Sequence, residues 1–226
     1  MKSVNVKLSS RIAILLNYFL GVIFIYPAIL ELIIRGIKAN ESLSILLKII
    51  YTLVITVVFI FIMRKALVDD FKNIKGNYKA VIIQTLKYLG LMLVANLIIG
   101  NLLNLIGSSS ENEAALKEVM NLSLPLLFVN AVIFAPIVEE AVFRLAIFRP
   151  LREKNRIVAY VVSSVLFGLL HVIGSANLIN YLQIILYASM GYFLAKNYEK
   201  NNSLIASISL HFLNNLLAFT LSMFLK

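Results

Sequence analysis

Three short motifs place ionisable and amide side chains inside apolar stretches of this sequence. The stretch FAPIVEEAVFRLAIF (residues 134–148) contains two adjacent glutamates and an arginine, and the only two histidines stand in FGLLH (167–171) and HFLNN (211–215). A carboxylate and an imidazole that share a buried water can act as general base and orienting partner, because desolvation raises a carboxylate pKa toward neutrality. The motifs therefore predict hydrolytic chemistry.

Helical spacing gives the two glutamates different surroundings. Glu140 and Arg144 are four residues apart, so they share a helix face and can pair. Glu139 is rotated from Glu140 by about 100 degrees, and it is left to face another element. Pro136 has no backbone N–H, so it should kink the helix and free a carbonyl near the site.

The histidines supply the remaining groups. If the helices that carry Glu139 and His171 form an antiparallel hairpin that turns near Asn155, the two side chains lie at the same depth. His211 and Asn215 are four residues apart on one helix face, where both can donate hydrogen bonds to a developing oxyanion. We expect Glu139 and His171 to activate water on one side of a carbonyl, with the donors on the other.

The same side chains also suit a metal ion. Two histidines and a carboxylate with an open position match a hydrolytic zinc site, in which bound water has a pKa near 7. The candidate ligands are Glu139, His171 and His211, and the residue types do not choose between the two mechanisms. A serine nucleophile is less favoured, since Ser164 and Ser207 share faces with the histidines only at spacings that any packed helix offers.

Composition identifies the surroundings in which these motifs must work. The chain has 226 residues, of which 61% are hydrophobic and 14% charged, and its mean hydropathy is +0.91. We expect one integral membrane domain over residues 1–226, because the polar intervals leave no room for a soluble domain. There are no cysteines. The net charge of +10 is explained by cytoplasmic loops, so nucleic acid is not an expected partner.

Apolar runs along the whole chain are long enough to cross a bilayer. They are continuous rather than alternating, which favours helices, and hydrocarbon offers the backbone no other hydrogen-bond partners. The sequence predicts an all-α, polytopic transmembrane bundle of about seven spans, with eight helices as the alternative. The predicted spans are 12–34, 44–63, 80–106, 121–147, 157–173, 178–195 and 203–225.

The distribution of Lys and Arg predicts the orientation of the spans. Fourteen of the 21 basic residues lie at the N-terminus or in the second, fourth and sixth loops. The third and fifth loops are acidic or uncharged, whereas Arg35 and Lys38 in the first loop are exceptions to the bias. This bias predicts a cytoplasmic N-terminus and an external C-terminus. The segment LVDDFKNIKGNYK (67–79) is expected to be a solvated cytoplasmic loop, with a segment that lies along the cytoplasmic interface as the alternative. The fourteen basic residues are Lys2, Lys7, Arg11, Arg64, Lys65, Lys72, Lys75, Lys79, Arg149, Arg152, Lys154, Arg156, Lys196 and Lys200.

The three motifs resemble those of a known family. EEAVFR (139–144), FGLLH (167–171) and HFLNN (211–215) are similar, in order and spacing, to the EExxxR, FxxxH and HxxxN motifs of the CAAX prenyl protease type II and bacteriocin-processing family (CPBP, or Abi) of intramembrane proteases. The resemblance covers roughly residues 120–220, which would be the catalytic core. The first three spans carry no motif.

This resemblance implies a role for each motif residue. Glu139 would activate water with His171 as its partner, and His211 with Asn215 would stabilise the oxyanion, His211 being also a possible metal ligand. Glu140 and Arg144 would be supporting residues. Asn214 also neighbours His211, although the motif favours Asn215. The family's site opens toward the cytoplasm.

The expected function is that of an intramembrane endopeptidase that acts on a peptide or membrane-protein substrate in the lipid bilayer. Eukaryotic members of the family trim prenylated proteins, whereas small members, which this chain resembles in size, are associated with the bacterial cell membrane and with bacteriocin maturation or self-immunity. One alternative is a noncatalytic bacteriocin immunity or scaffold protein. A proton-coupled transporter is less favoured, because the sequence shows no paired halves.

Overall fold

The computed structural model describes residues 6–224, and every regular element in that range is a helix. Lys2 and Leu225, which were included in the predictions above, lie outside the described residues. The helical segments are α1 (Leu8–Leu16), η1 (Asn17–Ile25), α2 (Tyr26–Gly36), α3 (Glu41–Lys75), α4 (Tyr78–Leu105), α5 (Glu111–Leu122), α6 (Leu124–Leu127), η2 (Phe128–Phe134), α7 (Ala135–Glu140), η3 (Ala141–Phe148), α8 (Arg149–Lys154), α9 (Arg156–Val172), η4 (Leu178–Gln183), α10 (Ile184–Asn201) and α11 (Leu204–Phe224).

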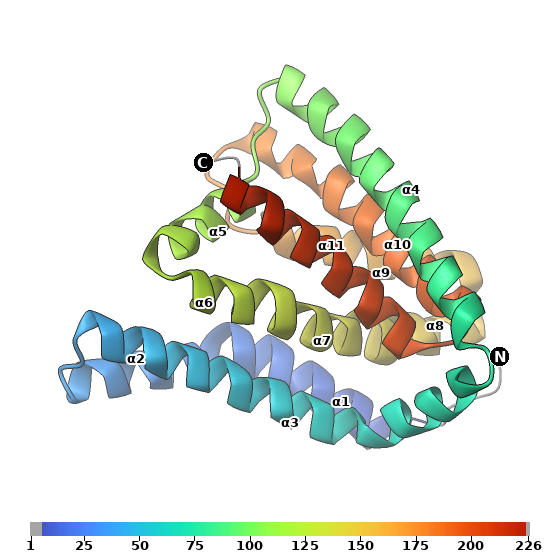
Figure 1. Ribbon diagram of the computed structural model, residues 1–226, viewed down its shortest axis with the longest axis horizontal. Helices are drawn as coiled ribbons and strands as arrows, with labels where there is room; N and C mark the ends of the chain where they lie inside the picture. Colours follow the sequence, from blue (N-terminus) through green and yellow to red (C-terminus); the bar gives the residue numbers. More distant parts are fainter. Residues whose placement is uncertain (1–5, 225–226) are drawn as a thin grey trace.

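Several segments join end to end, so residues 6–224 form eight continuous helices (Figure 1). Six are long and apolar enough to cross a membrane. The helix α9 has 17 residues, and at 1.5 Å per residue it is about 26 Å long, close to the roughly 30 Å of a bilayer's hydrocarbon core. Each of the seven predicted spans is helical, and the predicted all-α polytopic bundle is confirmed.

Two helical stretches were not predicted. Residues 67–75 are not a loop, because α3 continues to Lys75, one residue before Gly76. The interval before the fourth span contains α5, whose N-terminus is capped by Ser110, the side chain of which accepts a hydrogen bond from the Glu113 N–H. Such a cap, together with acidic residues in the first turn, stabilises a helix that is too polar to show as an apolar run.

A wide π-helical turn precedes each of the three prolines that lie inside long helices. The segments η1, η2 and η3 end two residues before Pro27, Pro136 and Pro150. In each case the residue just before the proline still donates its N–H to a carbonyl five residues back. Proline has no N–H and its ring crowds the preceding turn, so a local widening of the helix accommodates it without ending the helix.

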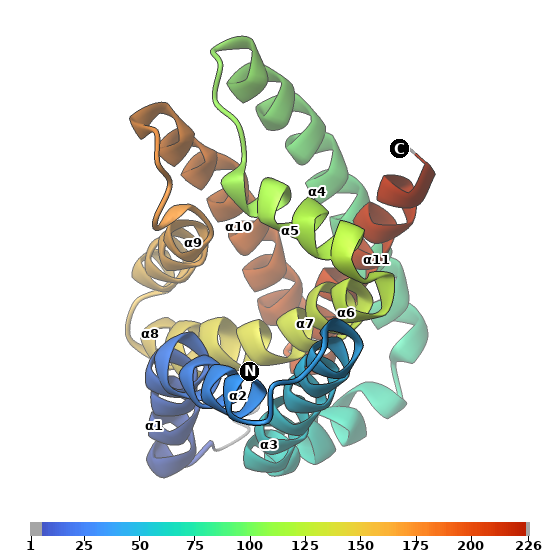
Figure 2. The same cartoon turned by 90° about the vertical axis from the view of Figure 1, so that its left-hand side faces the viewer.

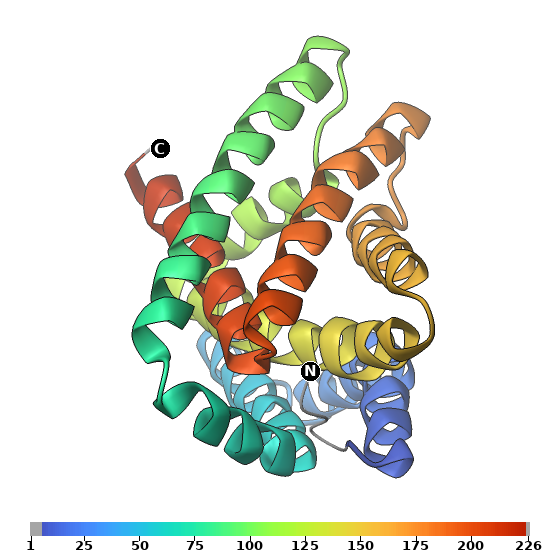
Figure 3. The same ribbon diagram turned by 90° about the vertical axis from the view of Figure 1, so that its right-hand side faces the viewer.

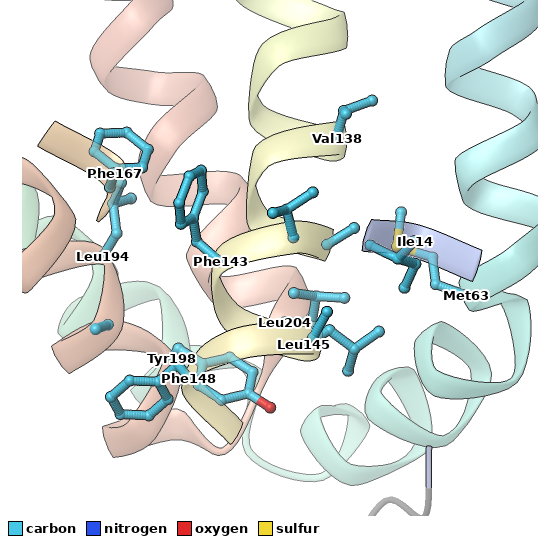
Figure 4. Close-up of a cluster of buried hydrophobic side chains, with 14 of the residues drawn as sticks. Ile14, Met63, Val138, Phe143, Leu145, Phe148, Phe167, Leu194, Tyr198 and Leu204 are labelled. Carbon is cyan, nitrogen blue, oxygen red and sulfur yellow. The ribbon is translucent and has the colours of Figure 1, made fainter. Parts of the chain in front are cut away.

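The continuous helix Leu124–Lys154, which carries the first motif, runs through the middle of the molecule (Figures 1 and 2). The helices α1, α2 and α3 lie on one side of it, and α9, α10 and α11 lie on the other. Figure 4 shows the resulting core, with Ile14 and Met63 on one side of this helix and Phe167 and Leu194 on the other. The first motif is therefore covered from both sides.

The connections with basic residues gather at one end of the bundle, which is the right-hand end in Figure 1. There the Asp70 carboxylate near the end of α3 accepts hydrogen bonds from Ser203 Oγ (3.1 Å) in the α10–α11 connection and from the Ile205 N–H (2.7 Å) in the first turn of α11. Arg152 and Arg156, from the α8–α9 connection, both pair with Glu199 near the end of α10. The loops predicted to share one membrane face do lie together, and the assignment of that face to the cytoplasm stays a prediction.

Two glycines allow α9 and α10 to approach closely (Figure 3). A Cβ atom on Gly168 would lie 2.8 Å from the Ile184 carbonyl oxygen, and one on Gly191 would lie 3.1 Å from Ser164 Cα and 3.2 Å from Phe167 Cβ. Any side chain at either position would push the two helices apart. The glycines thus hold Phe167, in the second motif, deep in the bundle.

Candidate active site

A fully buried ion pair forms the base of the site. Arg144 Nε donates to Glu140 Oε2 at 2.9 Å, and neither side chain is exposed. Arg144 Nη1 donates to Ser163 Oγ at 2.7 Å, while Ser207 Oγ donates to Glu140 Oε2 at 2.5 Å. A buried pair is tolerated when further hydrogen bonds satisfy its charged atoms. The pairing expected from the four-residue spacing is therefore present, and two serines add hydrogen bonds to it, while Arg144 Nη2 is buried without a hydrogen-bond partner.

Glu139 has a different environment. Its Oε2 atom is buried and has no hydrogen-bond partner, although the side chain as a whole is 15% exposed. Its ion-pair partner is His211, whose Nε2 lies 4.0 Å from Glu139 Oε2. This distance is too long for a direct hydrogen bond, but it leaves the carboxylate aimed at an imidazole nitrogen.

His211 lies between the two carboxylates and faces them with different ring nitrogens. Its Nδ1 is 3.2 Å from Glu140 Oε1. The Glu140 carboxylate, paired with Arg144, is an acceptor, so Nδ1 is the nitrogen that carries the proton. In the neutral ring Nε2 then presents a lone pair toward Glu139.

His171 is held at the end of α9 by its own helix and by two aromatic rings. Its Nδ1 donates to the Phe167 carbonyl at 2.8 Å. The ring centroid lies 4.6 Å from that of Phe167 and 4.5 Å from that of Tyr187, which stacks on it at 20°. Phe167 also contacts His211, with ring centroids 5.9 Å apart. Phe167 is thus the bridge between the two histidines.

The predicted pairing of Glu139 with His171 through a shared water stays a prediction. No hydrogen bond or ion pair joins them within residues 6–224, and the imidazole that faces Glu139 is that of His211. The hairpin argument gave the two residues the same depth. Depth does not fix the direction in which a side chain leaves its helix, and here His171 points toward Tyr187.

Asn215 satisfies a backbone carbonyl that Pro136 leaves without a donor. In η2 the Ala135 N–H donates to the carbonyl five residues back, that of Asn130. The next bond in this pattern would join residue 136 to Ala131, but proline has no N–H. Asn215 Nδ2 donates to the Ala131 carbonyl instead, at 2.8 Å. The predicted carbonyl without a backbone donor is therefore present, and the Asn215 side chain donates a hydrogen bond to it.

Asn214 supports Asn215 and does not replace it. Its Nδ2 donates to Asn215 Oδ1 at 3.1 Å, which fixes the orientation of the Asn215 amide. A side-chain amide has two N–H donors, so Asn215 keeps one for another acceptor. The structure accordingly gives Asn215 two contacts and leaves it one free proton.

The candidate metal ligands are not gathered. Among residues 6–224, no three His, Asp or Glu side chains lie close enough together to hold a metal ion. Zinc would require nitrogen and oxygen ligands at about 2.0–2.2 Å, whereas His171 has its contacts with Phe167 and Tyr187. This arrangement of the described residues does not fit a zinc site.

Three residues of the site were missed by sequence reasoning. Ser163 and Ser207 serve the buried ion pair, and Tyr187 stacks on His171. Ser207 stands four residues before His211, a spacing that could have indicated a shared role. Nothing marked Ser163 or Tyr187, because serine and tyrosine are ordinary residues of apolar helices. Ser164 Oγ, in contrast, is buried without a partner.

Comparison with known proteins agrees with the motifs. Residues 121–217 match the family model described as type II CAAX prenyl endopeptidase Rce1-like. A curated relative, "Putative membrane peptidase YdiL" of Bacillus subtilis (strain 168), is 36% identical over 111 residues, which are 49% of this chain and 42% of that protein. No solved structure matches significantly. The matched segment contains all three motifs, so residues 121–217 are similar to Rce1-like CAAX endopeptidases, and the chain spans less than half the length of the curated relative.

Proposed function

We propose that this protein is an intramembrane endopeptidase that hydrolyses a peptide bond with water activated at Glu139. The observation that carries the proposal is the unpartnered Glu139 Oε2 beside the Nε2 of the buried His211. A carboxylate oxygen without a hydrogen bond in an apolar bundle is costly unless it has a task. The family match and the relative's name support a peptidase.

The 4.0 Å between Glu139 Oε2 and His211 Nε2 suits one bridging water. A polar separation above about 3.5 Å is commonly filled in this way. The water would donate one hydrogen to the carboxylate and the other to the Nε2 lone pair, so that its oxygen lone pair faces a substrate carbonyl. As the oxygen attacks, Glu139 removes the proton and later delivers it to the leaving amine, and the carbon–nitrogen bond breaks.

The negative charge that develops on the carbonyl oxygen needs a donor. Asn215 stands one turn beyond His211 on α11 and retains one amide proton after its bond to Ala131. We assign it to the oxyanion, in keeping with the family motif, because fixed dipoles stabilise such charge without reorganisation. His211 was expected to share this role, but its Nδ1 proton faces Glu140, so we assign its Nε2 to the water instead. His171, held by Phe167 and Tyr187, presents its Nε2 to the substrate and is the second acid–base group.

Glu139 lies midway along the continuous helix Leu124–Lys154. At 1.5 Å per residue each end is roughly 22 Å away, so the scissile bond must enter the membrane or reach the site along the helices. The substrate is therefore a peptide or a membrane protein with an apolar segment. Positive charge at one end of the bundle supports a cytoplasmic N-terminus, and the bacterial source of the curated relative supports a bacterial cell membrane.

The test is cleavage by purified protein in detergent, read by mass spectrometry on a defined set of apolar fluorogenic peptides. Glu139→Gln should lower turnover by about 10²–10⁴-fold, the usual effect of removing a general base, while melting stays near wild type. Glu153→Gln, at a 60% exposed side chain on the same continuous helix, is the matched control. Undiminished turnover by Glu139→Gln would refute the assignment. A protein that acts only by binding would keep its function in the Glu139→Gln variant.

A further inference from the structure

We propose that Tyr187 is a positioning residue that fixes the His171 ring and connects it to α5, at the end of the bundle opposite the basic connections. The catalytic consequence rests on the function proposed above, but the contact itself does not. Tyr187 lies outside the three motifs, on α10. Its side chain is buried and touches the site with its ring and the α4–α5 connection with its hydroxyl.

The His171 imidazole is held between two aromatic rings. Tyr187 stacks on it at 4.5 Å and 20°, and Phe167 lies at 4.6 Å and 34°. Two rings stacked at such distances on one face of an imidazole would overlap, so they occupy opposite faces. With Nδ1 bound to the Phe167 carbonyl, the ring has one orientation, and its Nε2 is the nitrogen left to act.

The Tyr187 hydroxyl is anchored outside the catalytic helices. It lies 2.6 Å from Ser110 Oγ and accepts a hydrogen bond from Asn112 Nδ2 at 3.3 Å. Ser110 is also the residue that caps α5. A ring whose two ends are both fixed cannot tilt, whereas a ring held by stacking alone can slide.

The same end of α5 fixes the chain that follows His171. The Glu111 carboxylate accepts hydrogen bonds from the Ala176 N–H and from Asn180 Nδ2, both at 2.9 Å. His171 is thus restrained twice by the start of α5, through Tyr187 and through the connection after α9. A catalytic group must be held closely, because a misplacement of about 1 Å can cost about 10²-fold in rate.

The chain allows a direct test by NMR, because it has only two histidines. His171 and His211 give two sets of imidazole signals, which His171→Gln assigns by removing one. Tyr187→Leu removes the ring current above His171, so its ring protons should shift while those of His211 stay. Tyr187→Phe keeps the stacked ring and loses the hydroxyl anchor, so the His171 signals should keep most of their shift and broaden. Ser110→Ala with Asn112→Ala should reproduce the Tyr187→Phe effect.

Kinetics then separate positioning from stability. We expect Tyr187→Leu to lower kcat by roughly 10–100-fold with KM changed less than twofold, and Tyr187→Phe to fall between it and wild type. Tyr192→Phe, on the same helix but 40% exposed, is the control and should change neither the spectrum nor the rate. Rescue by phenylalanine would not be expected if Tyr187 only donated a hydrogen bond to substrate.

The outcomes distinguish this inference from the proposed function. Unchanged His171 signals in Tyr187→Leu overturn the inference, as does full kcat in a variant whose His171 signals have moved. If wild type cleaves none of the peptides, the proposed function fails while the spectra still decide whether Tyr187 holds the ring. Should Tyr187→Leu fail to fold, Tyr187→Phe and the Ser110–Asn112 double variant carry the same comparison.

Discussion

The first three long helices and the last three are all apolar enough to cross a membrane, yet they differ in how much of their surface is buried inside the protein. In the first three, residues 8–105, between 11% and 22% of the most apolar window is buried inside the protein. In the helices Leu124–Lys154, Leu178–Asn201 and Leu204–Phe224 the buried share is 50%, 44% and 33%. The first group therefore presents most of its side chains to lipid, and the second packs against protein.

The ionisable residues follow the same division. Lys87 stands in the middle part of α4 with an exposed side chain, where a long aliphatic stem can carry the ammonium toward the interface. Arg144 is completely enclosed and depends on Glu140 and Ser163. A charge in the first group is accommodated by the reach of its own side chain toward the interface. A charge in the second group is stabilised by hydrogen bonds and ion pairs inside the protein.

The largest expected difference between the two groups comes from breaking an ion pair in each. Glu140→Gln leaves the buried Arg144 guanidinium without its counter-ion and should cost about 3–5 kcal/mol. Glu31→Gln breaks the same four-residue pair with Arg35 on α2, but those side chains are 52% and 77% exposed, so the cost should be below about 1 kcal/mol. The measurement is the midpoint of unfolding in mixed micelles.

A double variant checks the cause. Glu140→Gln combined with Arg144→Met removes both charges, and it should recover much of the stability lost in the single variant. Equal losses at positions 31 and 140 would contradict the division between lipid-facing and enclosed charge.

Glycines give a second, smaller contrast. Gly191→Leu places a side chain against Ser164 and Phe167 and should destabilise the protein by about 1–3 kcal/mol through overpacking. Gly90→Leu puts the same side chain on α4, where nothing lies within 4 Å of the new Cβ, and should change stability by less than about 0.5 kcal/mol. Thermal unfolding of the two variants gives the comparison, and a loss at Gly90 that matched the loss at Gly191 would show that α4 packs more closely than described.

The smallest effect concerns pH at α5. The hydrogen bond from the Asn180 amide lowers the pKa of Glu111 below its ordinary value of 4.5. Because the folded-state pKa is depressed, the tie to Ala176 is complete above about pH 4.5 and is lost as the pH falls through the lower folded-state value. The Ala176 amide proton shift should therefore titrate with a midpoint below 4.5.

Two variants interpret that titration. Glu111→Gln should abolish it, since the amide that replaces the carboxylate does not ionise. Glu113→Gln, two residues further along α5, should leave it in place. A midpoint at or above 4.5 would mean that the Asn180 contact does not stabilise the charged form.

The spans were predictable because hydrocarbon imposes one simple requirement, about 20 apolar residues in a helix. An apolar run such as 80–106 satisfies this length requirement whatever other helices pack against it. The helix α5 and the extension of α3 to Lys75 could not be found in this way. Both are polar. The helix α5 begins at the Ser110 cap, and the extension of α3 is tied to the start of α11 through Asp70. A search for apolar runs detects neither feature.

Within the site, local relations were predictable and relations between helices were not. The Glu140–Arg144 pair follows from spacing on one helix. That Glu139 faces His211, with His171 turned toward Tyr187, depends on how three helices rotate about their axes. The motifs predicted which residues form the site, but the contacts between residues on different helices depend on how the helices pack.

The π turn before Pro136 changes how tolerance to mutation should vary along the catalytic helix. A wider turn has more residues per revolution than an α-helix, so the same face recurs after a longer interval. A scan of aspartate substitutions across η2 and η3 should show peaks of lost expression spaced further apart than a scan across α9, which is regular throughout. The spacing of positions at which aspartate lowers expression would then show where the helix around Glu139 has the wider turns that precede proline.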